Sequence, residues 1–204
     1  TLFRSLSVDH VKLAIHFLSA MVLACYTLWF ALQLLIPEEK RARSNSLHRF
    51  TIIVIALLSV QLLYGAFMAG LKAAMSAPTW PTINGMWIPD NLMQHSFVSD
   101  PINVHFVHRT LAYLLLIVLV FWFAKAGKYL KANQPSLLSK TRWWTVLLVC
   151  LQVLLGICTV ISAPTIIVGK FGQYQTLAEL HQLVAMFLLM SLIVNLYVVR
   201  KTKA

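Results

Sequence analysis

The sequence is poor in charge, and above all in acidic charge. Only 11% of its 204 residues are charged and six are acidic, whereas a typical soluble domain is about 25% charged. Seven Gly, seven Pro and three Cys are too few for a collagen-like chain, a disordered chain or a disulfide scaffold. In contrast, 59% of the residues are hydrophobic and the mean hydropathy is +0.77. This composition excludes a soluble globular domain and favours a polytopic helical membrane protein.

Long apolar runs dominate the chain. Five of them reach about 20 residues or more, the length that an α-helix needs to cross a bilayer. None has the short apolar core and cleavage site of a signal peptide. We therefore expect an all-α membrane protein with five transmembrane helices. The helices are expected over residues 11–36, 47–71, 104–124, 143–163 and 176–199.

The basic residues gather on alternate connections. Segments 37–49, 125–142 and 200–204 hold twelve of the 17 Lys and Arg. The positive-inside rule then places the N-terminus of this chain outside and its C-terminus inside. No basic patch is interleaved with exposed aromatic residues, so nucleic acid is not an expected partner, and membrane lipid is.

Part of the sequence is repeated. Gln61-Leu-Leu-Tyr-Gly65 matches Gln152-Val-Leu-Leu-Gly156, and each stretch is followed by Ser-Ala-Pro and then by a helix with a His near its start. Residues 47–204 are therefore expected to form a four-helix bundle from two repeated helical hairpins, with a long outer loop over 72–103. Residues 1–36 would supply the last helix of an earlier four-helix half that this chain lacks, joined by an inner loop over 37–46.

Three histidines stand at one expected depth. His16, His108 and His181 each lie four to six residues inside the outer end of their helix, which is roughly 6–9 Å. Equal depth on different helices suits two axial ligands of a heme iron. A single membrane histidine can instead simply hydrogen-bond a neighbouring helix. Because His108 and His181 match in the repeat, we interpret this pair as the iron ligands.

Other residues near these histidines are candidate heme contacts. Gly65 and Gly156 have no side chain where a flat porphyrin, or another helix, has to come close. Gln61 and Gln152 lie near mid-membrane and need partners, for which an interhelical hydrogen bond is favoured over ligand contact. Arg109, with the interfacial loops, is a candidate for receiving heme propionates.

The strings around these residues resemble the heme A synthase family over essentially the whole chain. They are Gln61-Leu-Leu-Tyr-Gly-Ala-Phe-Met-Ala-Gly-Leu-Lys-Ala, Thr79-Trp80-Pro81-Thr-Ile-Asn-Gly, Asn103-Val-His-Phe-Val-His108-Arg109 and Glu179-Leu-His181-Gln182. The resemblance implies eight helices in two pseudosymmetric halves, of which this chain has the fourth to eighth. It also implies that His108 and His181 hold a heme b, that His16 belongs to the half that binds the substrate heme O, and that Trp80 is part of the heme-binding loop string.

The implied activity is oxidation of a ring methyl of heme O to a formyl group in heme A biosynthesis. The resemblance puts the catalytic acid in the N-terminal half, so no catalytic residue is assigned here and the fragment alone is expected to be inactive. It implies a bacterial, or else mitochondrial, inner membrane and, as partners, heme O synthase and an electron donor, and it is compatible with an oligomer. The alternatives are a b-type electron-transfer subunit without synthase activity, and a hairpin-repeat transporter that binds no heme.

Overall fold

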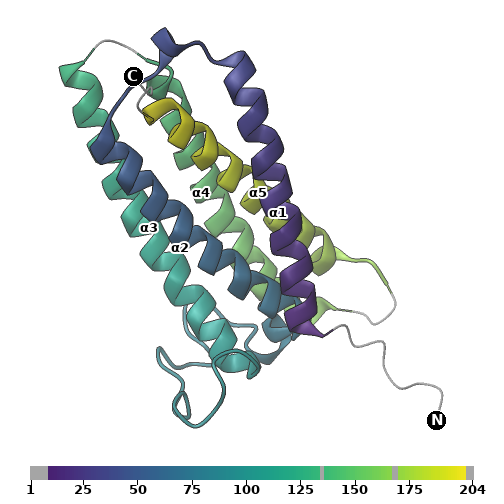
Figure 1. The fold of residues 1–204 in the computed structure, drawn as a ribbon. Helices are drawn as coiled ribbons and strands as arrows, with labels where there is room; N and C mark the ends of the chain where they lie inside the picture. Colours follow the sequence, from purple (N-terminus) through teal and green to yellow (C-terminus); the bar gives the residue numbers. More distant parts are fainter. Residues whose placement is uncertain (1–8, 134–135, 167–169, 201–204) are drawn as a thin grey trace.

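Five long helices make up the computed structural model, which describes residues 9–133, 136–166 and 170–200 (Figure 1). Each helix is long and apolar enough to cross a membrane, and no strand occurs in these ranges. The predicted all-α membrane fold with five spans is confirmed. The long helices are α1 (His10–Leu35), α2 (Asn45–Gly70), α3 (Pro101–Ala132), α4 (Leu138–Ser162) and α5 (Gln173–Val199), and the short 3-10 helices are η1 (Glu38–Lys40), η2 (Ala73–Ser76) and η3 (Ala163–Thr165).

Helices α3 and α4 extend further than the hydropathy pattern predicts. The sequence suggests a connection over residues 125–142, but α3 continues to Ala132 and α4 begins at Leu138. Lysines end the apolar run without ending the helix, because Lys is a good helix former whose long side chain can carry its charge to the membrane surface. At its other end α3 begins at Pro101, and the Asp100 carboxylate accepts a hydrogen bond from the amide of Asn103 at 2.9 Å.

Helices α2 to α5 contact one another in a ring. Helix α2 contacts α3, α3 contacts α4, α4 contacts α5, and α5 contacts α2, while α1 packs against α2 and α5 (Figure 1). The most extensive contacts are α2 with α3 and α4 with α5, which are the two hairpins of the sequence repeat. The order of the ring places α3 and α5, the helices that carry the repeat histidines, at diagonal positions.

A polar contact fastens each hairpin near the basic end of the molecule. The Trp122 indole donates to the hydroxyl of Thr51 at 2.9 Å, and the Asn195 amide donates to the hydroxyl of Thr145 at 2.9 Å. All four side chains are buried. Trp122 and Asn195 each follow the histidine of their helix by 14 residues. Both hairpins therefore have a buried polar contact between their two helices toward this end.

At the other end, Arg109 fastens the long loop between α2 and α3. Its Nε donates to His105 Nε2 at 2.9 Å, so one helical turn of α3 joins the two side chains. A guanidinium has five N–H donors, and here all five have protein acceptors. The other four go to the loop carbonyls of Ala77, Thr79, Pro81 and Thr82, at 2.6–3.4 Å.

The loop itself is folded around Asn84. The backbone N–H of Asn84 donates to the Thr79 hydroxyl at 2.8 Å, and the Asn84 side-chain amide donates to the Ser76 carbonyl at 2.9 Å. Asn84 and Gly85 both have positive φ, 51° and 89°, as expected of the Asn-Gly turn in the sequence. Arg109 thus holds a loop that already has internal order.

Replacing Arg109 with Lys should loosen this loop. Lysine keeps the charge but cannot direct five donors in a fixed fork, so buried loop carbonyls lose their partners. We expect a loss of about 2 kcal/mol in unfolding free energy, the scale of one hydrogen bond to a charged group. Amide hydrogen exchange across residues 76–86 should speed up, whereas the exposed control Lys128→Arg should leave it unchanged. Unaltered exchange in the Arg109→Lys protein would contradict the anchoring role.

Candidate functional site

Two Gln–His pairs, one in each hairpin, form the centre of the candidate site. Gln61 Nε2 lies 3.4 Å from His108 Nε2, which joins α2 to α3, and Gln152 Nε2 lies 3.1 Å from His181 Nε2, which joins α4 to α5. In both pairs the amide donates and the ring nitrogen accepts. The interhelical hydrogen bonds expected for the two glutamines are confirmed.

The two histidines lie at nearly the same depth. His108 is the eighth residue of α3 and His181 the ninth of α5. The two histidines therefore stand at a similar level on the diagonal helices of the ring. Each histidine is deeper within its helix than the sequence suggests, because α3 and α5 both begin three residues before the predicted starts.

A backbone carbonyl fixes the orientation of the His181 ring. Its Nδ1 lies 3.1 Å from the carbonyl oxygen of Gln152 and donates its proton there. A neutral ring with the proton on Nδ1 presents a lone pair at Nε2, and the Gln152 side chain caps this lone pair. Metal-binding histidines have the same arrangement, with one ring N–H on a carbonyl and the other nitrogen toward the metal.

Gly156 makes this contact with the carbonyl accessible. In an α-helix the carbonyl of residue 152 is directed at the amide of residue 156. A Cβ added at Gly156 would lie 3.0 Å from His181 Cε1 and 3.5 Å from Nδ1. A side chain of the neighbouring helix therefore makes the close approach at this glycine, and contact of Gly156 with a porphyrin stays a prediction.

The first hairpin repeats this arrangement with more space. A Cβ added at Gly65 would lie 3.4 Å from His108 Cε1 and 4.0 Å from Nδ1. His108 Nδ1, unlike His181 Nδ1, is buried without a hydrogen-bond partner in the described structure. The side-chain oxygens of Gln61 and Gln152 are also buried and unpaired. Buried polar atoms without partners are rare, which points to a ligand with polar or metal groups.

The donor set suits a metal held in a flat ring rather than a bare ion. Across residues 9–133, 136–166 and 170–200, no three His, Cys, Asp or Glu side chains are close enough to hold a metal ion together. Two neutral imidazoles, each beside a glycine, are what a ring-bound iron with two axial ligands would use. The residues present therefore fit a heme. Binding of the iron would require the hydrogen bonds from Gln61 and Gln152 to the two histidine Nε2 atoms to break.

The remaining candidates are not gathered at this pair. His16 lies on the exposed face of α1, and Trp80 is 44% exposed on the long loop. The donors of Arg109 are taken by His105 and the loop carbonyls, which leaves none for a propionate. The sequence interpretation missed the Arg109–His105 bond, although the spacing of four residues on one helix face could have signalled it.

Comparisons with known proteins agree with this architecture. Residues 1–193 match the model of the family COX15-CtaA, described as cytochrome oxidase assembly protein. The heme A synthase of Flavobacterium johnsoniae is 32% identical over 197 residues, which cover 93% of this chain and 54% of that protein. The heme A synthase of Novosphingobium aromaticivorans is 34% identical over 180 residues, 82% of this chain and 49% of that protein.

The chain spans about half the length of these relatives, and no solved structure matches it. The family match nevertheless extends over almost the whole sequence, and the relatives align over more than four-fifths of it. Together with five helices able to cross a bilayer, this shows that the chain is an integral membrane protein and belongs to the cytochrome oxidase assembly protein family COX15-CtaA.

Proposed function

We propose that this chain serves heme A biosynthesis as an oxidoreductase component that binds a heme b through His108 and His181. The observation that carries the proposal is the hydrogen bond from His181 Nδ1 to the Gln152 carbonyl, because it leaves the lone pair on Nε2, the nitrogen that would bind the iron. The names of the relatives supply the pathway, since they are heme A synthases. In this proposal residues 47–204 are the heme-binding unit, and residues 1–36 border it.

The chain's own residues have distinct tasks at the site. His108 and His181 present their Nε2 atoms from two diagonal helices, and Gln61 and Gln152 keep these atoms hydrogen-bonded when no iron is bound. A heme held by His108 and His181 would supply one-electron transfer rather than oxygen activation. We assign the oxidation of heme O to no residue of this chain, and His16 stands as the candidate contact to that substrate.

Arg109 contributes indirectly in this proposal. It holds the loop that carries Trp80, so the loop string shared with the family is kept in a fixed place at the outer ends of α2 and α3. The deeply buried His105 supports Arg109 from the helix itself. Trp80 remains the candidate for direct contact with the heme.

Removing either iron ligand should abolish stable heme binding. We expect His108→Ala and His181→Ala proteins to lose the heme measured in a pyridine hemochrome assay, because one imidazole alone binds the iron weakly. The loop variant His95→Ala is the matched control and should retain the wild-type content. Unchanged heme content in both helix variants would rule out the proposed ligation.

The two glycines should differ in their tolerance of a methyl group. Gly156→Ala places Cβ 3.0 Å from the His181 ring and must displace it, whereas Gly65→Ala meets the His108 ring at 3.4 Å, an ordinary contact. We expect Gly156→Ala to weaken heme affinity by roughly 10–100-fold, the usual cost of disturbing a residue that orients a metal ligand. Gly65→Ala should change it much less. Heme titration followed at the Soret band measures both, and equal losses would refute the difference.

A further inference from the structure

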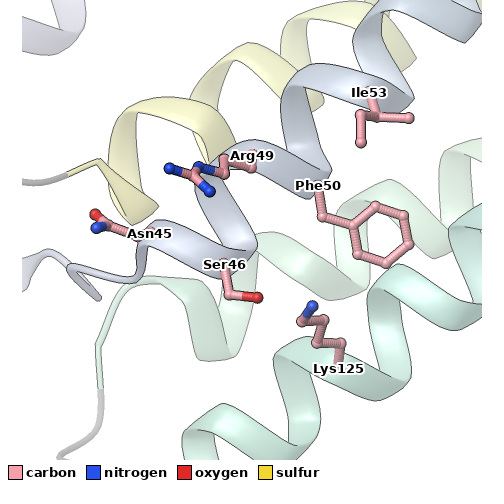
Figure 2. Close-up of a pocket in the computed structure, with 6 residues that line it drawn as sticks. All are labelled: Asn45, Ser46, Arg49, Phe50, Ile53 and Lys125. Atoms are coloured by element: carbon pink, nitrogen blue, oxygen red, sulfur yellow. The ribbon is translucent and has the colours of Figure 1, made fainter.

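A hollow opens at the other end of the molecule, where α2 begins beside α3 (Figure 2). Lys125, the one lining residue from α3, follows His108 by 17 residues, which is roughly 25 Å along a helix. The hollow is therefore separate from the heme site. Its lining consists of Asn45, Ser46, Arg49, Phe50, Ile53 and Lys125.

The hollow carries positive charge without a compensating acid. Arg49 and Lys125 are both exposed, and none of the six lining residues is acidic. Within the part of the chain that the structure describes, the two salt bridges both use Glu38, which pairs with Arg41 and Arg43. An anion that enters the hollow would therefore meet two cations that are free to bind it.

Lys125 is held toward the hollow. Its Nζ lies 5.5 Å from the centre of the Phe50 ring, a cation–π contact that draws the ammonium to the α2 side. Figure 2 shows this ammonium and the Ser46 hydroxyl pointing into the space between the two helices. A cation and a hydroxyl donor from different helices are thus directed at one small volume.

Apolar side chains continue from the hollow toward the membrane core. Ile53 is 61% exposed and lies two turns into α2, and Phe121 is 64% exposed and lies one turn from Lys125 on the same face of α3. A free phosphate has no apolar part that could cover these surfaces. A molecule with an anionic head and hydrocarbon chains would cover both parts.

We propose that this hollow binds an anionic phospholipid. The phosphate binds Lys125 and the Ser46 hydroxyl, Arg49 and Asn45 contribute from the rim of the hollow, and an acyl chain runs along Ile53 and Phe121. The charge arrangement fits this partner, because basic residues at the membrane surface attract anionic lipid. The connecting segments at this end of the molecule hold most of the Lys and Arg of the chain. The site ties α2 and α3, the first hairpin, to the lipid around it.

Native mass spectrometry of the purified, heme-loaded full chain in detergent can test this, with phosphatidylglycerol and phosphatidylcholine of equal chain length as probes. The wild-type protein should retain phosphatidylglycerol preferentially. Arg49→Gln and Lys125→Gln should each reduce that preference by about fivefold, the usual effect of one surface cation. The exposed Lys131→Gln variant, outside the hollow, is the matched control and should behave as wild type.

Two further measurements distinguish the contribution of the lipid head group to binding from that of the acyl chains. Ile53→Ser should weaken retention of both lipids equally, and soluble glycerol phosphate should compete poorly with phosphatidylglycerol. Equal retention of the two lipids by wild type, or wild-type preference in the Arg49→Gln/Lys125→Gln double variant, would overturn the proposal. Full competition by glycerol phosphate would also overturn it, because the site would then bind phosphate alone. An unchanged Soret band shows that each variant is folded.

Discussion

The hydrogen bond from His181 to the Gln152 carbonyl is the constraint on which the candidate site depends. A side chain can reach a carbonyl that already belongs to a helix only where the helix surface is open, and Gly156 provides that opening. The bond fixes which ring nitrogen carries the proton. It thereby makes Nε2 the ring nitrogen that carries the lone pair, and this lone pair accepts a hydrogen bond from the Gln152 amide.

The repeat gives the site its second half and its depth. Because α2 and α3 copy the plan of α4 and α5, a second imidazole stands beside a second glycine at nearly the same level. Buried contacts from Trp122 and Asn195 hold the hairpins together toward the basic end, and the hydrogen bonds of Arg109 hold the long loop between α2 and α3 at the opposite end.

The sequence predicted the spans, the hairpins and part of the candidate site, and particular residues explain why. Apolar runs predicted five spans, the Gln-x-x-x-Gly repeat predicted the hairpins, and the mid-membrane position of Gln61 and Gln152 predicted interhelical hydrogen bonds for both. The length of α3 was not predictable from hydropathy, which registers the lysines after residue 124 as polar although they continue the helix. The hydrogen bonds between Arg109 and the long loop were not predicted, and neither was the hollow at Lys125. Both depend on contacts between segments that lie apart in the sequence and meet only in the folded protein.

Electron paramagnetic resonance of the oxidised, heme-loaded protein tests the central claim most directly, because it reports on the axial ligands of the iron. The account predicts a low-spin ferric signal of the bis-imidazole type, which either His108→Ala or His181→Ala eliminates while the His95→Ala control preserves it. A high-spin signal in the wild-type protein, or a low-spin signal that survives in both variants, would contradict it.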